Sequence, residues 1–285
     1  MNNRRRTIFV DRDGVVRSGW AIAIVVLLNV IAGIVMTMTM SGMLQSVEDP
    51  AAAVSMAVRL LVAIASTWVG CRLVRQPLGA AGFADSRKLL HCAIGCALGI
   101  VLMALTVGVP WAIGAIGLAA TPHGASTLIR AGAIQLAVMT PASVSEEILV
   151  RGFLLQQLAR GLGPIAAIAV TSLLFGLIHL FNPDATLAGA AAITLVGVWF
   201  ALLVMATRSL WLTFGLHTAW NVFEGFVFGQ PVSGYDLSVS ILRRTEIGST
   251  AWTGGAFGPE ASAWLAVLLV IAIVTTFFVV KVTLR

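Results

Sequence analysis

The sequence predicts an all-α, polytopic membrane protein with about eight transmembrane helices and a polar site inside the membrane. Hydrophobic residues make up 59% of the 285 positions and charged residues only 11%, with a mean hydropathy of +0.97. A soluble domain of this length usually carries about 25% charged and 45–50% apolar residues. The excess apolar surface must therefore face lipid, and several apolar runs are long enough to do so.

Eight stretches are long enough to cross about 30 Å of hydrocarbon as helices. They lie near 18–44, 52–73, 91–119, 131–159, 164–181, 185–206, 209–229 and 262–281. Pro110 and Pro141 fall inside the third and fourth stretches, and we expect them to kink or interrupt these helices. The longest polar connection, 230–261, is expected to be an outer loop, and the sequence indicates no role for it.

The basic residues indicate how the chain is oriented. The net charge is +6, but the Lys and Arg residues lie in short segments between apolar runs, so we expect no nucleic-acid partner. With both termini cytoplasmic, thirteen of them fall on the inner side and three on the outer side, as the positive-inside rule requires. This predicts a cytoplasmic basic tail, 1–17, and a single membrane domain, 18–285, whose first span is retained.

The fourth apolar stretch contains three ionisable residues, Glu146, Glu147 and Arg151. An unpaired charge in hydrocarbon costs several kcal/mol, so such residues usually face a partner or a cavity. Glu147 and Arg151 are four residues apart, which predicts an ion pair on one helix face. Glu146 is rotated by about 100° around the helix and stays available as a general base.

Two neighbouring stretches add imidazole and amide groups. Phe175 and His179 are four residues apart near the end of the fifth stretch, and His217 and Asn221 repeat this spacing in the seventh. Glu224 lies about another turn along, with no role indicated. A carboxylate with one histidine can activate water, while a second histidine and an asparagine can donate hydrogen bonds to an oxyanion. The combination suits hydrolysis of an acyl bond.

Each feature also has a purely structural interpretation. A Glu–Arg pair can clamp a helix, and a histidine near a helix end can lie at the interface. An asparagine can simply hydrogen-bond a neighbouring helix. Arg59, in the second stretch, is expected to extend toward the membrane surface. The occurrence of all three arrangements in adjacent helices favours a shared site.

The segments Glu146-Glu-Ile-Leu-Val-Arg151-Gly152, Phe175-Gly-Leu-Ile-His179 and His217-Thr-Ala-Trp-Asn221 resemble, in the same order, the three motifs of the CPBP family. This family comprises the CAAX proteases and the bacteriocin-processing or Abi proteins. The resemblance is best over about 120–229. Val150 departs from the pattern, since many members carry an aromatic residue there.

The resemblance implies an intramembrane endopeptidase of the glutamate type, with a catalytic core at about 131–229 and no cofactor or metal. Glu146 would activate water with His179 as its partner, and His217 and Asn221 would form the oxyanion hole. Glu147 and Arg151 would support the site. A zinc site built from Glu146, His179 and His217 is the alternative mechanism, although the chain has no His-Glu-x-x-His motif.

The substrate implied is a membrane-associated peptide or protein tail, of the CAAX or bacteriocin type, processed in contact with the lipid bilayer. The alanine-rich, short-looped chain resembles the bacterial members, which implies the inner (plasma) membrane. The sequence does not indicate an oligomeric state. Two other classes stay open: a non-catalytic binding or immunity protein, and a proton- or ion-coupled transporter, although no repeated halves are visible.

Residue counting also predicts a conflict. Measured from the ends of the expected spans, Glu146, His179 and His217 differ in depth by about 10 Å or more, at about 1.5 Å per residue. A shared site therefore requires different helix ends, a shift of register or strong tilts.

Overall fold

The computed structural model describes residues 8–11, 13, 15–40 and 49–283. Most arginines of the expected basic tail, and the end of the first expected span at 41–44, lie outside the described residues. The helices and strands are, in chain order, α1 (Ser18–Met40), α2 (Pro50–Leu73), α3 (Lys88–Ala112), β1 (Ile116–Ala120), α4 (Ala125–Glu147), α5 (Leu155–Leu162), α6 (Pro164–Ile178), α7 (Leu187–Thr207), α8 (Trp211–Val222), β2 (Leu242–Glu246), α9 (Thr250–Thr253) and α10 (Ala263–Thr283). Two π-helical segments, Ile148–Leu154 and Phe223–Val227, continue α4 and α8.

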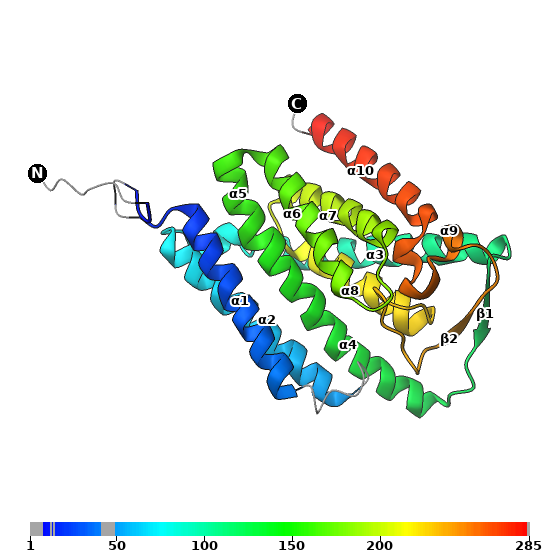
Figure 1. Cartoon of the computed structure of the whole chain (residues 1–285). Helices are drawn as coiled ribbons and strands as arrows, with labels where there is room; N and C mark the ends of the chain where they lie inside the picture. Colours follow the sequence, from blue (N-terminus) through cyan, green and yellow to red (C-terminus); the bar gives the residue numbers. More distant parts are fainter. Residues whose placement is uncertain (1–7, 12, 14, 41–48, 284–285) are drawn as a thin grey trace, which may run out of the picture.

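The predicted all-α membrane class is confirmed, with a different division of the helices. Six helices are long and apolar enough to cross a membrane, in the described part of the chain. The apolar part of α10, Ala263–Val279, is shorter. α8 has only 12 residues, too few to cross about 30 Å, and eight of them are buried. It is a central helix enclosed by its neighbours (Figure 1).

The end expected for the third stretch is wrong. The third helix ends at Ala112, and Ile116–Ala120 instead forms an antiparallel pair with Leu242–Glu246 from the 230–261 loop. Neither Pro110 nor Pro141 interrupts its helix, and the kink expected as the alternative stays a prediction. The pattern of helical hydrogen bonds changes only at Ile148, where the π segment begins.

Glycines bring the central helices into backbone contact. A Cβ on Gly95 of α3 would lie 1.9 Å from the Leu212 carbonyl oxygen of α8, and one on Gly215 would lie 2.1 Å from the Cys92 oxygen. Close approach through small residues is typical of membrane helices. These contacts fix the position of α8, and with it His217.

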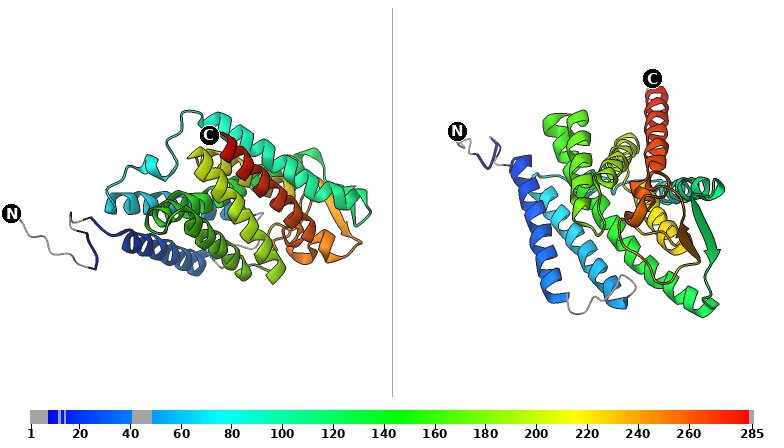
Figure 2. Two further views of the ribbon diagram at one scale, coloured as in Figure 1. Left: turned by 90° about the horizontal axis from the view of Figure 1, so that it is seen from above. Right: turned by 45° about the vertical axis from the view of Figure 1, so that its right-hand side comes forward.

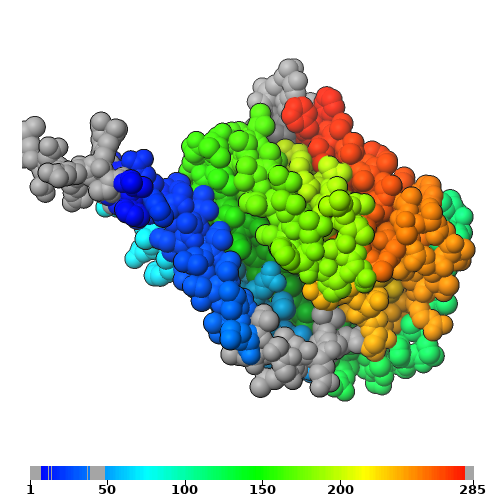
Figure 3. All heavy atoms as spheres, in the orientation of Figure 1, coloured from blue at the N-terminus to red at the C-terminus, as the bar shows by residue number. Residues whose placement is uncertain are grey.

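The helices surround this centre unevenly. α1 and α2 pack together along one side of α4, and α10 lies on the opposite side of the molecule (Figures 1 and 2). The face shown in Figure 3 is hollowed between α1 and α6. The hydrophobic core lies mainly between α3, α7, α8 and α10, around Phe200, Leu216 and Trp220.

Candidate active site

A buried ion pair lies where α4 changes into its π segment. Arg151 Nη1 donates to Glu147 Oε1 at 2.9 Å, as the four-residue spacing predicts. The side chains are 1% and 0% exposed. The Arg151 guanidinium also lies 4.1 Å from the Phe175 ring centroid and 5.4 Å from that of Phe200. Two aromatic faces and one carboxylate therefore fix this cation.

The same carboxylate orients His217. His217 Nδ1 lies 3.1 Å from Glu147 Oε1, and because an ionised carboxylate only accepts hydrogen bonds, Nδ1 carries the hydrogen. The ring is enclosed edge-on by Phe200 and Phe175, with centroids at 5.5 Å and 6.4 Å. His217 Nε2 is left for other partners.

His179 has the same arrangement at the end of α6. Its Nδ1 donates to the Phe175 carbonyl oxygen at 2.7 Å, since a carbonyl can only accept. The Phe175 ring lies 4.7 Å away in an edge-on contact, as the repeat of four predicts. Nε2 of His179 is therefore also uncommitted to the backbone.

The two histidines line one small cavity. Its volume is about 20 Å³, enough for about one water molecule. It is lined by Phe175, His179, Ile193, Val196, Phe200, His217, Trp220, Ser233 and Glu260. A water here could bond to both imidazoles and to an acidic side chain.

Glu146 has a partner that the sequence analysis did not anticipate. Arg59 Nη2 lies 3.3 Å from Glu146 Oε1, with side-chain exposures of 48% and 23%. Arg59 therefore extends inward from α2 to the site, which corrects the expectation that it reaches the membrane surface. Glu146 is ion-paired in this structure, whereas the sequence analysis expected a free carboxylate.

Asn221 completes the set from α8. Its Nδ2 donates to Ser143 Oγ of α4 at 3.2 Å, which leaves one amide hydrogen for another acceptor. Ser143 is thus a support for this amide, in addition to being a packing residue.

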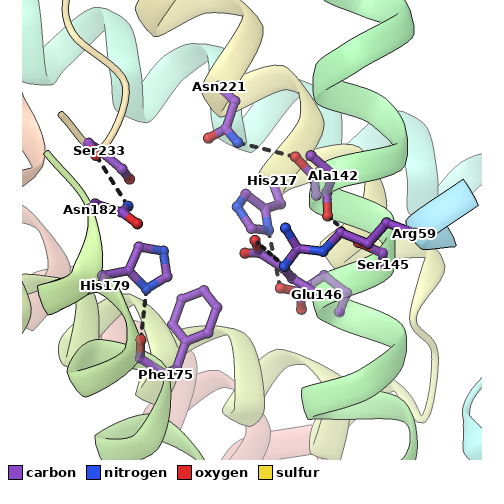
Figure 4. Close-up of polar contacts among 12 residues, drawn as sticks. Arg59, Ala142, Ser145, Glu146, Phe175, His179, Asn182, His217, Asn221 and Ser233 are labelled. Carbon is purple, nitrogen blue, oxygen red and sulfur yellow. Dashed lines mark hydrogen bonds and ion pairs between the residues drawn. The ribbon is translucent and has the colours of Figure 1, made fainter. Parts of the chain in front are cut away.

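The predicted residues converge in spite of the conflict in depth. Glu146, His179, His217 and Asn221 surround one space in Figure 4. His179 and His217 line one cavity. The conflict disappears because the real helix ends differ from the expected ones: α8 is short and central, and His179 follows a short α6.

The structure adds acidic residues from the 230–261 loop and the end of α8. Glu260, which is 7% exposed, lines the cavity beside both histidines, and Ser233 donates a hydrogen bond to it. Glu224 is fully buried and accepts from Trp220 Nε1 at 3.0 Å. The available sequence signal was weak: Glu260 is an acidic residue in a Gly-Pro-Glu turn directly before an apolar helix.

A metal site does not fit these residues. Within the part of the chain that the structure describes, no three His, Cys, Asp or Glu side chains are arranged to hold a metal ion. The alternative zinc site of Glu146, His179 and His217 therefore lacks the required ligand arrangement, and we derive no step through a metal.

A larger apolar groove lies beside the Arg59–Glu146 ion pair. It has a volume of about 540 Å³ and is lined by residues of α1, α2, the first π segment and α6. Arg59 is the charged residue in this lining, and Phe175 lines both the groove and the small cavity. Phe175 therefore lies between the groove and the small cavity.

Fold and site together define a polytopic membrane protein with a carboxylate–histidine site enclosed by its helices. Residues 129–223, about a third of the chain, match a family model described as Type II CAAX prenyl endopeptidase Rce1-like. This match covers the segment that carries the three motifs, and the six long apolar helices make the chain an integral membrane protein. None of the curated proteins matches the chain.

Proposed function

We propose that this protein is an intramembrane endopeptidase of the glutamate type that cleaves membrane-associated peptide or protein tails. One observation carries the proposal: Glu146 faces the same space as two histidines whose Nδ1 atoms are both engaged, so that both Nε2 atoms are available to a substrate or water (Figure 4). The catalytic core is the 131–229 segment of a single membrane domain, 18–285.

In the proposed reaction, Glu146 takes a proton from water as the water oxygen attacks the peptide carbonyl carbon. His179 Nε2 accepts a hydrogen bond from this water and orients it. The carbonyl oxygen becomes negative and accepts from the free Asn221 amide hydrogen. His217 can also donate to it when protonated, as an imidazolium stabilised by the Glu147 carboxylate.

The apolar groove supports the substrate class. A tail anchored in the bilayer by a hydrocarbon group, such as the prenyl group in the family description, would leave that group in the groove. Because Phe175 lines both spaces, the adjoining peptide would then lie next to Glu146 and His179. Such a substrate would keep its apolar part out of water throughout cleavage.

The proposed topology has both termini in the cytoplasm of a bacterial inner membrane. The distribution of basic residues supports it. The start of α1 and the end of α10 also lie toward the same side of the molecule, in the upper part of Figure 1, with the β1–β2 pair near the other end.

The decisive experiment measures cleavage of a library of lipidated and unlipidated fluorogenic tail peptides by the purified protein. Glu146→Gln should lower kcat by about 10²–10⁴-fold, the usual contribution of a general base, while thermal unfolding stays unchanged. Glu246→Gln changes a partly exposed carboxylate of β2 and is the matched control. This variant should cleave the peptides as the wild type does. Full activity of folded Glu146→Gln protein would refute the mechanism, and activity lost with a strong chelator would favour a metal enzyme.

The groove can be tested separately. Leu174→Trp places a large side chain in the groove lining, whereas Leu173→Trp changes the neighbouring residue, which faces outward and does not line it. We expect Leu174→Trp to raise KM for tails with long hydrocarbon groups and to spare unlipidated peptides. Equal effects of the two variants on both substrates would show that the groove does not hold the hydrocarbon.

A further inference from the structure

A carboxyl group from outside the three motifs faces the proposed site. Glu260 belongs to the short helix Pro259–Ala261 at the end of the 230–261 loop, just before α10 and outside the residues matched by the family model. It lines the one-water cavity together with His179 and His217. Among the groups assigned a role above, only Glu146 can supply a proton to the nitrogen that leaves when the peptide bond breaks.

The loop holds Glu260 in place through several contacts. Ser233 donates a hydrogen bond to Glu260 Oε2, and the Ser233 carbonyl accepts from Asn182 Nδ2 at 3.1 Å, which ties the loop to the segment after His179. Figure 4 shows Ser233 and Asn182 beside His179. Gly234 has a φ of +89°, and a Cβ there would lie 1.9 Å from the Pro183 oxygen, so the loop approaches this segment as only glycine allows.

The charges around Glu260 suit a carboxyl that exchanges a proton. The titratable groups that act on it are His179 and His217 across the cavity, and it acts in turn on the buried Glu224 of the second π segment. Burial raises the pKa of Glu260 above its ordinary value, opposed by the Ser233 hydrogen bond and by the two histidines. A neutral carboxyl is a hydrogen-bond donor as well as an acceptor.

We infer that Glu260 is a proton donor of the proposed site, acting through a cavity water that is distinct from the attacking water. This inference rests on the proposed function. As the peptide C–N bond breaks, the proton of Glu260 passes through this water to the departing nitrogen, while Glu146 keeps the proton taken from the attacking water. After release of both products, Glu146 loses its proton to solvent and Glu260 regains one, so the sum is one water consumed per bond cleaved.

The first test compares Glu260→Gln, Glu260→Asp and Glu246→Gln. Glu246 accepts a hydroxyl hydrogen bond from Thr253 much as Glu260 does from Ser233, but it does not line the cavity, so it controls for loss of a loop carboxylate. We expect Glu260→Gln to lower kcat by at least about 10²-fold with little change in KM, and to remove one ionisation from the pH profile of kcat. Glu260→Asp should restore that ionisation and part of the rate. Wild-type kcat and pH profile in folded Glu260→Gln would overturn the inference and leave the protease proposal intact.

A second measurement does not depend on cleavage. Infrared pH titration of wild type and Glu260→Gln should show a protonated-carboxyl band that the substitution removes, and His179→Gln should shift its titration. If the wild type cleaves no tail, the protease proposal fails and this inference with it; the titration then tells only whether Glu260 exchanges a proton in the cavity. If it cleaves tails but Glu260 titrates like an exposed glutamate, unaffected by His179, the proton-donor role alone is refuted.

Discussion

At the scale of single residues, one carboxylate organises most of the site. Glu147 Oε1 receives both Arg151 and His217, and it is fully buried. Removing one partner of a buried ion pair leaves an uncompensated charge, which is far more costly than losing an exposed pair. Glu147 and Arg151 should therefore act as a unit.

This coupling can be measured with a double-mutant cycle. We expect Glu147→Gln and Arg151→Met each to lower the free energy of unfolding by about 3–5 kcal/mol, and the double variant to lose much less than the sum. Equilibrium unfolding in mixed detergent micelles measures both effects. The corresponding cycle for Arg59 and Glu146, whose side chains are partly exposed, should give a coupling of at most about 1 kcal/mol. Additive effects at Glu147 and Arg151 would contradict the interpretation of one buried pair.

Asn221 makes a different prediction, because it is proposed to contact the oxyanion. Asn221→Ala should lower kcat by about 10²–10³-fold with KM nearly unchanged, the typical loss for one oxyanion donor. Ser143→Ala removes only the hydroxyl that holds the amide and should have a smaller effect on kcat. Steady-state kinetics of both variants show which substitution lowers kcat more. A larger loss for Ser143→Ala would be inconsistent with Asn221 as the donor to the oxyanion.

At the scale of elements, the contact between α3 and α8 determines where His217 lies. Gly215→Ala places a Cβ 2.1 Å from the Cys92 backbone oxygen, so the two helices must separate. Overpacking of this kind costs about 1–3 kcal/mol, and it should lower activity as well because His217 follows two residues later.

Gly108→Ala supplies the matched control in the same helix pair. Gly108 lies in α3, and a Cβ on it would meet no atom of a neighbouring element within 4 Å, so alanine there should change stability by less than about 0.5 kcal/mol. Thermal unfolding and cleavage rates of both variants test the claim. Equal behaviour of Gly215→Ala and Gly108→Ala would mean that α3 and α8 are not in tight contact.

At the scale of the whole molecule, a polar cluster joins the α2–α3 connection to the turn between α7 and α8. Ser209 Oγ donates to Asp85 Oδ2 at 2.6 Å, His91 Nδ1 lies 2.6 Å from the same oxygen, and the Arg87 N–H donates to Oδ1 at 2.8 Å. The Ser209 hydrogen bond chiefly lowers the pKa of Asp85 to about 2, partly opposed by desolvation and helped by Arg87 and His91. The cluster holds the start of α8 against the α2–α3 connection.

This cluster predicts a loss of stability in acid. The pKa of Asp85 is lower in the folded protein than the value of about 3.9 in an unfolded chain, so its contribution is complete above about pH 4 and is lost as the pH falls toward 2. Ser209→Ala should raise the pKa of Asp85, lower the Tm at neutral pH and flatten the decrease between about pH 4 and 2. Thermal unfolding against pH measures this. An unchanged curve in Asp85→Asn would show that Asp85 has no part in it.

Features that depend on local spacing and on composition can be predicted from the sequence alone. An excess of apolar residues requires lipid, which settled the membrane class, and residues four apart on a helix must be neighbours, which settled the Glu147–Arg151 and Phe175–His179 contacts. The three motifs also indicated the family whose model matches residues 129–223. These inferences needed no knowledge of how the helices pack.

Contacts between distant segments could not be predicted from the sequence and are visible only in the folded chain. Arg59 meets Glu146 across 87 positions, and Glu260 reaches the histidines from a loop with no recognisable motif. The helix ends, the β1–β2 pair and the enclosed position of α8 likewise follow from packing, because hydropathy records how apolar a segment is and not which neighbours cover it. The packing of the helices sets the depth of each polar group, and it therefore brings the residues of the site together.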